Sequence, residues 1–509
     1  GRAFGDGSQC EVVAARVALE NQNTVVDSSS RMLSGTWLSE GCENRPGPEY
    51  VLRSYTFKPD GSYRFIQHHY WDDSCSTPKL TIVSVGLLRM KKGSMFHGDS
   101  SVGFIRPINI SIIPQDIRAT KELDDLVAHE CPDQNWKAWR RYDEHLVYEN
   151  NNFFKQTHYQ SREQYTGNSI SGRQMSQSSG DISCLGSLKW AFNELKLIKI
   201  QLRPIFMNSL DKKKPRNYRF ELLLGDIHSR TEHRENYSPT SYQQPLINHI
   251  PDGSIVNVNS KNYTIKNNCN ICANLFSSSK TPPHLFEKPH LPPFIWGEWT
   301  STRCEIRPMG LYLTRKFNFF ISNSEWVADH KFYDDPFCTI PKFVASVSGH
   351  FSLSAKNTVI PASTNIDLIL ENASLIIHSR RMVREMNLLK TCGPYNWKLG
   401  QAQDLSSTRG CAQLGILVPS VHYDIVKVEI NYEGNCLLYL GQFDTDNMPT
   451  TNADRPSAFQ EPLVKCGEAP NFIGEEDEYY DDLMMYNSSI QTQNLIHILI
   501  MSIALIKLL

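Results

Sequence analysis

The chain contains the same stretch of sequence twice, in the same order and with nearly the same spacing. Both stretches open with Gly-x-Trp and continue through a Cys-Glu pair to a second cysteine: Gly35, Trp37, Cys42, Cys75 and Gly297, Trp299, Cys304, Cys338. Self-similarity over a period this long is typical of a duplicated structural unit. The chain is therefore expected to fold into two versions of one domain, so that a role found in one copy predicts a role for its counterpart.

The repeat sets the expected domain boundaries. A polar lead-in precedes the first domain, and a Pro-rich linker with a Cys-x-x-Cys motif separates the two copies. The first copy is longer mainly because of a polar, low-complexity insertion over 150–183, which we expect to be disordered. The expected segments are the lead-in 1–30, the first domain 31–248, the linker 249–293, the second domain 294–466, an acidic stalk 467–494 and a hydrophobic segment 495–509.

Each copy has the residue pattern of β-strands. The stretch from Arg53 to Phe57 alternates so that Arg53, Tyr55 and Phe57 share one face, and the stretch around Arg315 and Phe317 repeats this in register. Further segments rich in Val, Ile and Phe follow in both copies, and few segments have a helical period. The sequence predicts an all-β fold of two tandem antiparallel domains, each a lipocalin-like barrel that is closed or partly open.

Gly-x-Trp near the start of a β domain is the opening of the lipocalin pattern, in which the tryptophan closes the floor of the barrel. Trp37 and Trp299 stand at the same point of both copies. An eight-stranded barrel has an interior that side chains can fill or that can hold one small ligand. The sequence leaves open whether the aromatic residues line a groove or fill a core. We expect Arg53 and Arg315 to pack on a ring or to pair with Glu43 and Glu305.

The chain has 13 cysteines, and the repeat brings many of them to matched positions. Matched cysteines predict a disulfide framework and an oxidising compartment. The disulfide favoured for the Cys-x-x-Cys motif would be local, since no second such motif completes a zinc site. We expect Cys436 to be unpaired, and Cys10 with Cys466 is a weaker candidate. The favoured pairs are Cys42 with Cys75, Cys131 with Cys184, Cys269 with Cys272, Cys304 with Cys338, and Cys392 with Cys411.

Composition and motifs exclude several functional classes. The net charge is −2 and the isoelectric point is about 6.8, so nothing indicates a nucleic-acid partner. The sequence has no HExxH motif, no GxSxG elbow and no Walker A loop, and it predicts no enzyme, cofactor or metal site.

Two features place the chain in the secretory pathway. The glycosylation motif Asn-x-Ser/Thr occurs at Asn109, Asn262, Asn372 and Asn487. The apolar segment 495–509 follows an acidic stalk and predicts attachment to a membrane. A short single-pass helix and a glycolipid-anchor signal both remain open, because a helix of this length falls short of the ~30 Å hydrocarbon core.

The chain resembles the adenomatosis polyposis coli down-regulated protein 1 family, as a divergent or invertebrate member. The segments that carry the resemblance are GTWLSEGCENRPGPEYVLRSYTF, LLLGDIHS, YSPTSYQQPL, GEWTSTRCEIRP and LVKCGEAPNF. The resemblance covers both copies, the linker and the hydrophobic tail.

The resemblance implies a membrane-tethered inhibitor of Wnt signalling on the extracellular face of the plasma membrane, binding an acylated Wnt protein and also a Wnt co-receptor. An apolar groove in a barrel would suit the monounsaturated acyl chain of Wnt, because burial contributes about 0.8 kcal/mol per CH₂. Candidate wall residues are Tyr55, Phe57, Phe317 and Phe319.

Other functions remain compatible with the residues. A lipocalin-like carrier would bind a small lipid without Wnt, and a receptor-binding scaffold would use the outer surfaces of the barrels. The sequence also leaves open whether two chains form a homodimer.

Overall fold

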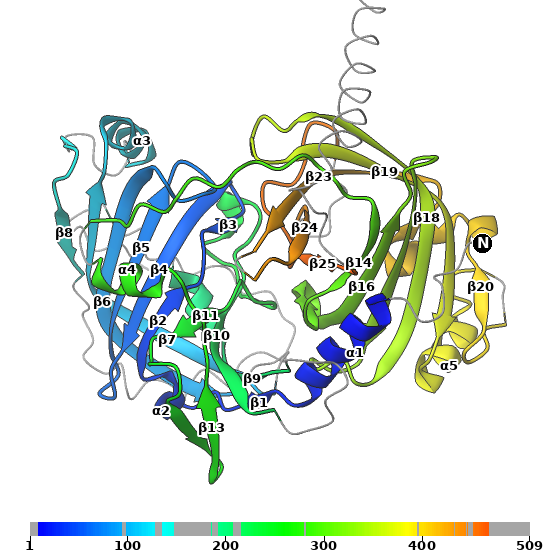
Figure 1. Cartoon of the computed structure of the whole chain (residues 1–509), viewed down its shortest axis with the longest axis horizontal. Helices are drawn as coiled ribbons and strands as arrows, with labels where there is room; N and C mark the ends of the chain where they lie inside the picture. Colours follow the sequence, from blue (N-terminus) through cyan, green and yellow to red (C-terminus); the bar gives the residue numbers. More distant parts are fainter. Residues whose placement is uncertain are drawn as a thin grey trace, which may run out of the picture.

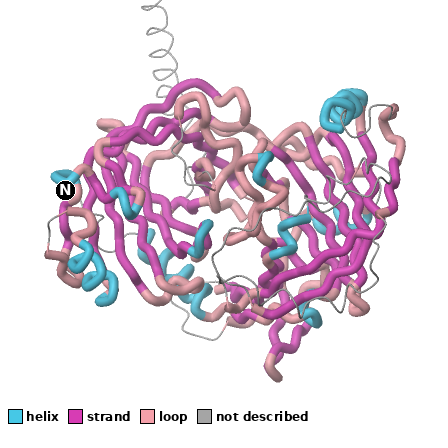
Figure 2. Tube along the Cα trace, turned by 180° about the vertical axis from the view of Figure 1, so that it is seen from behind, coloured by secondary structure: helices cyan, strands magenta, loops and turns pink. Residues whose placement is uncertain are grey.

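The computed structural model describes residues 9–93, 98–127, 135–146, 185, 192–206, 215–278, 281–393, 396–431, 433–443, 445 and 451–467. Two β-barrels lie side by side, and helix α1 (Gln9–Gln22) lies between them (Figure 1). Figure 2 shows the same arrangement from behind, with strands forming the walls of both halves. The expected all-β fold of two barrel domains is confirmed.

The first barrel is a ring of eight antiparallel strands. Its order is β2-β4-β5-β6-β7-β9-β10-β11, and β11 pairs with β2 to close the ring. The contact between β7 and β9 is a single residue pair, Ser101 with Ile198. The strands are β2 (Gly35–Ser39), β4 (Glu49–Phe57), β5 (Ser62–Tyr70), β6 (Pro78–Lys92), β7 (Ser101–Pro114), β9 (Ile198–Ile205), β10 (Asn217–Leu224) and β11 (Leu246–Asn248).

The second barrel repeats this ring strand for strand. Its order is β14-β16-β17-β18-β19-β23-β24-β25, with β25 back on β14. Here β19 and β23 pair over seven residues, from Thr364 to Leu370, so the seam is closed along its length. The strands are β14 (Gly297–Ser301), β16 (Leu311–Phe319), β17 (Glu325–Tyr333), β18 (Pro341–Lys356), β19 (Thr364–Ile377), β23 (Ser420–Ile430), β24 (Cys436–Leu440) and β25 (Leu463–Lys465).

Short helices, 3-10 turns and minor strands accompany the eight ring strands of each barrel. In each copy a helix follows the fifth strand in chain order, and in the second copy its residues Met382 and Met386 are buried in the barrel core. The helices are α2 (Ser30–Leu33), α3 (Ile117–Val127), α4 (Cys272–Ser277) and α5 (Arg380–Leu389), with 3-10 turns η3 (Thr231–His233), η4 (Pro308–Gly310), η5 (Ser406–Thr408) and η6 (Ala412–Leu414). The minor strands are β1 (Val25–Val26), β3 (Glu43–Arg45), β8 (Tyr142–His145), β12 (Ile255–Val258), β13 (Lys261–Ile265), β15 (Glu305–Arg307), β20 (Ala402–Asp404), β21 (Gly410–Cys411) and β22 (Ile416–Leu417).

A matched β-bulge shapes each barrel at a glycine. The register shifts between Val85 and Gly86 in the first copy and between Ser348 and Gly349 in the second. A Cβ at Gly86 would lie 2.3 Å from a backbone oxygen, and one at Gly349 would lie 1.9 Å from another. Only glycine allows this approach of neighbouring strands, and the extra twist of the bulge helps the sheet to curl into a ring.

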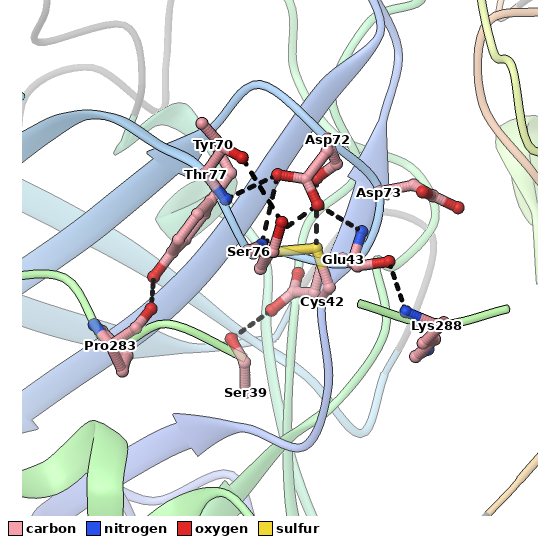
Figure 3. Close-up of a disulfide and its surroundings, with 12 residues drawn as sticks. Ser39, Cys42, Glu43, Tyr70, Asp72, Asp73, Ser76, Thr77, Pro283 and Lys288 are labelled. Carbon is pink, nitrogen blue, oxygen red and sulfur yellow. Dashed lines mark hydrogen bonds between the residues drawn. A yellow bond between two sulfur atoms is a disulfide. The ribbon is translucent and has the colours of Figure 1, made fainter. Parts of the chain in front are cut away.

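A disulfide loop is built in the same way in both copies, and Figure 3 shows the one in the first copy. Cys75 pairs with Cys42, and the Asp72 carboxylate accepts hydrogen bonds from the backbone N–H groups of Ser74, Ser76 and Thr77. In the second copy Cys338 pairs with Cys304, and Asp335 accepts from three N–H groups of its own loop. Both second cysteines adopt a φ of 55°, so the repeat preserves the backbone of this loop as well as its bond.

The remaining disulfides tie down the ends and the connections. The structure joins Cys10 to Cys466, Cys269 to Cys272 and Cys392 to Cys411, and leaves Cys436 free and buried. These agree with the pairs favoured from the sequence, including the weakly supported link between the two ends. Cys131 and Cys184 lie outside the described residues, as do the whole insertion 150–183, the stalk 467–494 apart from its first residue, and the hydrophobic segment 495–509.

Two segments carry more structure than the sequence indicated. The lead-in forms α1, which packs on β14 and β9 and so contacts both barrels. The linker adds β13 to the first barrel beside β10, and α4 packs on β2 and β4. Farther along the linker, the Pro283 carbonyl accepts a hydrogen bond from the Tyr70 hydroxyl at 2.7 Å (Figure 3). Neither segment has a strong hydrophobic periodicity, so the sequence alone did not predict these elements. Contacts with the barrels hold both segments in place. Within the described ranges, no helix is long and apolar enough to cross a membrane.

The two barrels face each other across a pseudo-two-fold axis. Counterparts are defined by a shared hydrogen bond, in which Gly225 N–H donates to Leu197 in the first copy and Gly441 N–H donates to Ile425 in the second. In this alignment Ser229 corresponds to Thr445. The backbone N–H of each donates to the hydroxyl of the other, at 3.0 and 3.1 Å.

A second pair of contacts repeats the same symmetry. Gly47 N–H donates to the Ser457 hydroxyl, and its counterpart Met309 N–H donates to the Thr240 hydroxyl, both at 2.9 Å. Such reciprocal bonds define an interface in which the same patch of each unit meets the other. The duplicated domains therefore pack as an internal dimer.

Candidate ligand-binding site inside the barrels

The candidate groove residues lie on the inward faces of β4 and β16. Tyr55, Phe57, Phe317 and Phe319 are all at most 4% exposed and belong to the hydrophobic cores of their barrels. They point inward because strand side chains alternate, which places every second residue of the predicted pattern on the core side. The structure thus brings the two groups of aromatic residues to equivalent places in separate barrels.

The aromatic residues pack on rings from neighbouring strands. In the first barrel Phe65 lies 4.4 Å from Tyr55 and 5.1 Å from Phe57, measured between ring centroids. In the second barrel Phe319 lies 5.7 Å from Phe317 and 5.4 Å from Phe351. Offset and edge-to-face rings at these distances form a continuous apolar wall.

The two signature tryptophans are fully buried at the start of each ring. The Trp37 indole N–H donates to the Leu33 carbonyl at 2.7 Å, and the Trp299 indole N–H donates to the Ile295 carbonyl at 2.5 Å. Each bond reaches back four residues and fixes the turn that enters the barrel. Lys465 Nζ lies over the ring of Trp299, 5.5 Å from its centroid.

The arginines beside the aromatic wall form buried ion pairs. Arg53 donates to both oxygens of Glu43, at 3.0 and 2.7 Å, and Arg315 donates to Glu305 at 2.8 Å. A serine supports each pair: the hydroxyls of Ser39 and Ser301 donate to the same carboxylates, at 2.5 and 2.7 Å. The sequence analysis expected this pairing.

The ion pairs shift the pKa values of Arg53 and Glu305 by more than burial does, in the opposite direction. Burial alone would lower the pKa of Arg53, but Glu43 and Glu194 raise that pKa above its usual value. Burial alone would raise the pKa of Glu305, but Arg315 and Arg307 hold it below its usual value. Both barrels therefore keep charged groups inside at neutral pH.

Glu194 is a functional candidate that the sequence did not indicate. Its carboxylate accepts from Arg53 and Arg45, both at 3.1 Å, and from Gln243 at 2.6 Å. The Tyr55 hydroxyl also donates to it, and Gln67 Nε2 donates to that hydroxyl at 2.5 Å. Tyr55 is therefore an apolar wall residue with a polar end. Arg53 and Tyr55 of this network carried a sequence signal, through the alternation of their strand, whereas Glu194 itself carried none.

The second barrel replaces part of this network. His422, three residues before Ile425, stands where Glu194 stands three residues before Leu197. Phe317 replaces Tyr55. His330, the cross-strand partner of Arg315, replaces Gln67, the cross-strand partner of Arg53. The ring centroids of Phe317 and His330 are 5.5 Å apart. Burial lowers the pKa of His330 to about 3, so this imidazole is neutral.

The predicted glycosylation sites differ in access. Asn262 on β13 and Asn372 on β19 are exposed. Asn109 on β7 is half-buried, and its Nδ2 donates to Asp143 at 3.2 Å. Asn487 lies outside the described residues. Glycosylation stays a prediction at all four positions.

Comparison with known families matches the whole repeated region. A family model described as adenomatosis polyposis coli down-regulated 1 matches residues 9–286 and again residues 288–471. The two matches divide the chain where the second copy begins, and together they take in α1, the linker and both barrels. Membership is consistent with a regulator of the Wnt pathway. The chain belongs to the adenomatosis polyposis coli down-regulated 1 family.

Proposed function

We propose that this protein is an extracellular, membrane-tethered negative regulator of Wnt signalling that sequesters Wnt by binding its acyl chain. The observation that carries the proposal is the family match over both copies. A role by binding also agrees with the interior of the barrels, where aromatic rings form apolar walls. A Wnt co-receptor is a second candidate partner.

The physical argument rests on apolar burial. Each CH₂ of an acyl chain that enters an apolar site contributes about 0.8 kcal/mol, so a long chain can supply most of the affinity. Phe57 and Phe319 belong to the inward apolar walls that such a chain would contact, on strands that form closed rings. Tethering would confine the protein to the cell surface on which Wnt acts; the predicted anchor is the segment 495–509.

The test compares acylated Wnt with an acyl-deficient Wnt mutant on cells that display the full chain. Strong binding of the acylated form alone supports sequestration through the lipid. Equal binding of both forms would move recognition to the outer surface of the barrels. Retention of a fatty acid without any Wnt binding would instead indicate a lipid carrier.

Variants locate the groove. Phe57→Ala and Phe319→Ala each remove one inward ring, and Phe286→Ala removes an exposed ring (97% exposed) as the matched control. The barrel that binds the chain is expected to lose at least tenfold in affinity when its own ring is removed, whereas the control keeps full affinity. Far-UV circular dichroism and thermal unfolding of each variant separate a lost contact from a lost fold.

A further inference from the structure

Two lysines occupy equivalent positions on either side of the pseudo-two-fold axis. Lys199 lies two residues after Leu197 on β9, and Lys427 lies two residues after Ile425 on β23. Each faces the disulfide loop of the opposite barrel. Lys427 meets the loop that contains Asp73, and Lys199 meets the loop that contains Phe337.

Lys427 has a complete set of partners. Its ammonium lies 3.4 Å from an Asp73 oxygen and 2.5 Å from a Glu429 oxygen. It also lies over the rings of Tyr439 and Phe459, at 5.3 and 5.2 Å from their centroids. A buried ammonium needs such acceptors, because an uncompensated charge away from water is costly.

Lys199 has lost both of these carboxylates. Gln201 stands at the position of Glu429, and Pro336 stands at the position of Asp73. Lys199 is 5% exposed, and within the described part of the chain it forms no hydrogen bond or ion pair. Its contact is with the ring of Phe337, 5.2 Å from the centroid.

The charges around Lys199 do not supply the missing partner. Asp99 and Glu221 attract the ammonium through space and Arg303 repels it, and burial lowers its pKa to about 8. Asp99 is exposed to solvent, and Glu221 already accepts from Gln201 and Arg303, at 2.7 and 3.2 Å. The lysine is therefore protonated at neutral pH and lacks an acceptor.

A cavity adjoins this lysine. Its volume is about 50 Å³, enough for one small ion with a water molecule, and both barrels and α1 line it. Asn21 of α1 lines the same cavity and is 7% exposed. Its Oδ1 accepts from Cys304 N–H, so its Nδ2 is a second donor, without a partner among the described residues.

We propose that this cavity between the barrels binds a small inorganic anion of halide size, with Lys199 Nζ and Asn21 Nδ2 as donors. The anion would take the place of the carboxylates that Lys427 has in the equivalent site. Since the lining comes from both barrels, the bound ion would hold the internal dimer together. The inference goes beyond the proposed function and does not depend on it.

The test uses bromide as the probe, on the full chain. Crystals grown in bromide are expected to show an anomalous peak within about 3.5 Å of Lys199 Nζ. Thermal unfolding at constant ionic strength is expected to show a Tm that rises as bromide or chloride replaces gluconate, because a ligand that binds only the folded state stabilises it.

Gln201→Glu is the decisive variant, since it restores the carboxylate present at Glu429. It is expected to fold, to keep or raise the Tm, and to lose both the bromide peak and the halide-dependent shift. Gln401→Glu, at an exposed glutamine, is the matched control and should keep both. Lys199→Met should lose both as well.

Two results would overturn the proposal. One is a site filled only by water, for example a molecule that bridges Lys199 and the unpartnered Oε1 of Gln243. The other is a halide-dependent shift that persists unchanged in Gln201→Glu, which would place the responsible ion elsewhere.

Discussion

The two barrels share a scaffold and differ in what that scaffold holds inside. Both have the tryptophan at the entrance, the serine-supported Arg–Glu pair and the bulge at a glycine. In the first barrel two arginines face two carboxylates, Glu43 and Glu194. In the second, Arg307 and Arg315 both bind Glu305, and His422 replaces the other carboxylate. The two copies therefore share the residues of the scaffold and differ in polar residues inside the barrel.

Positions that both barrels share maintain the fold, whereas positions that differ set the polar surroundings inside each barrel. The Arg–Glu pair recurs because, in both copies, it joins a ring strand to the minor strand that pairs with it, β3 with β4 and β15 with β16. Glu194 accepts from four side chains of the first barrel. In the second barrel Arg307 instead donates to Glu305 and Gln460. A ligand that enters either barrel would therefore meet the same aromatic wall beside a different polar network.

The largest effect is expected from Glu194→Ala. The change leaves Arg45 and Arg53 buried with one carboxylate between them, and breaking such a pair costs about 3–5 kcal/mol. His422→Ala, at the equivalent place in the second barrel, should cost about 1 kcal/mol. Denaturant unfolding with hydrogen exchange resolved by barrel measures both. Equal costs would show that the two interiors are energetically alike.

Glu221→Gln is expected to weaken the contact between the barrels by about 2–4 kcal/mol, because it removes the carboxylate among three arginines. Burial alone would raise the pKa of Glu221, but Arg303, Arg203 and Arg219 lower it to about 2. The stabilisation is thus present above the ordinary pKa of 4.5 and is lost as pH falls toward about 2.

Loss of this contact would let the two barrels move apart. Small-angle scattering between pH 5 and 2 measures that change. The variant should lose that part of the pH dependence. The counterpart position is Leu437, so this titration has no equivalent across the axis.

Asp424→Asn is expected to stabilise the second barrel at neutral pH by about 1–3 kcal/mol. Burial raises the pKa of Asp424 to about 7, against an ordinary value of 3.8. A raised pKa means that the folded state holds its proton more tightly, so stability falls as pH rises from about 4 to 7.

The asparagine keeps the acceptor for the N–H groups of Ile425 and Gly441 and removes the charge. Unfolding curves at pH 5 and pH 8 test this. A variant that is less stable than the native protein at pH 8 would contradict it. The first barrel has Lys196 at this place, so it should not share the effect.

The smallest effect is expected from Tyr55→Phe, which gives the first barrel the residue that the second has at Phe317. The change removes the hydroxyl between Glu194 and Gln67 and should cost about 1–2 kcal/mol. Thermal unfolding measures it. An unchanged Tm would mean that Gln67 and Glu194 find other partners. The stabilities of the two interiors would then differ through the arginines alone.

Much of the fold could be predicted from the sequence because it depends on local or repeated patterns. The alternation from Arg53 to Phe57 identified the inward face, since side chains of a strand alternate wherever the strand is placed. The repeat identified the pairs Cys42–Cys75 and Cys304–Cys338, because both copies keep the same loop. Tyr55, Phe57, Phe317 and Phe319 are buried for the same reason, and their role as walls of a groove stays a prediction.

Only the tertiary structure decided what meets across the molecule. Glu194 lies far along the chain from Arg53, and Lys199 reaches a loop of the opposite barrel. No periodicity marks such residues, because each acts through a partner that closure of the ring or the pseudo-two-fold contact brings near. Sequence thus determined the unit and its repetition. The packing of one unit on the other decided which charges are matched and which, such as that of Lys199, have no ion-pair partner among the residues that the structure describes.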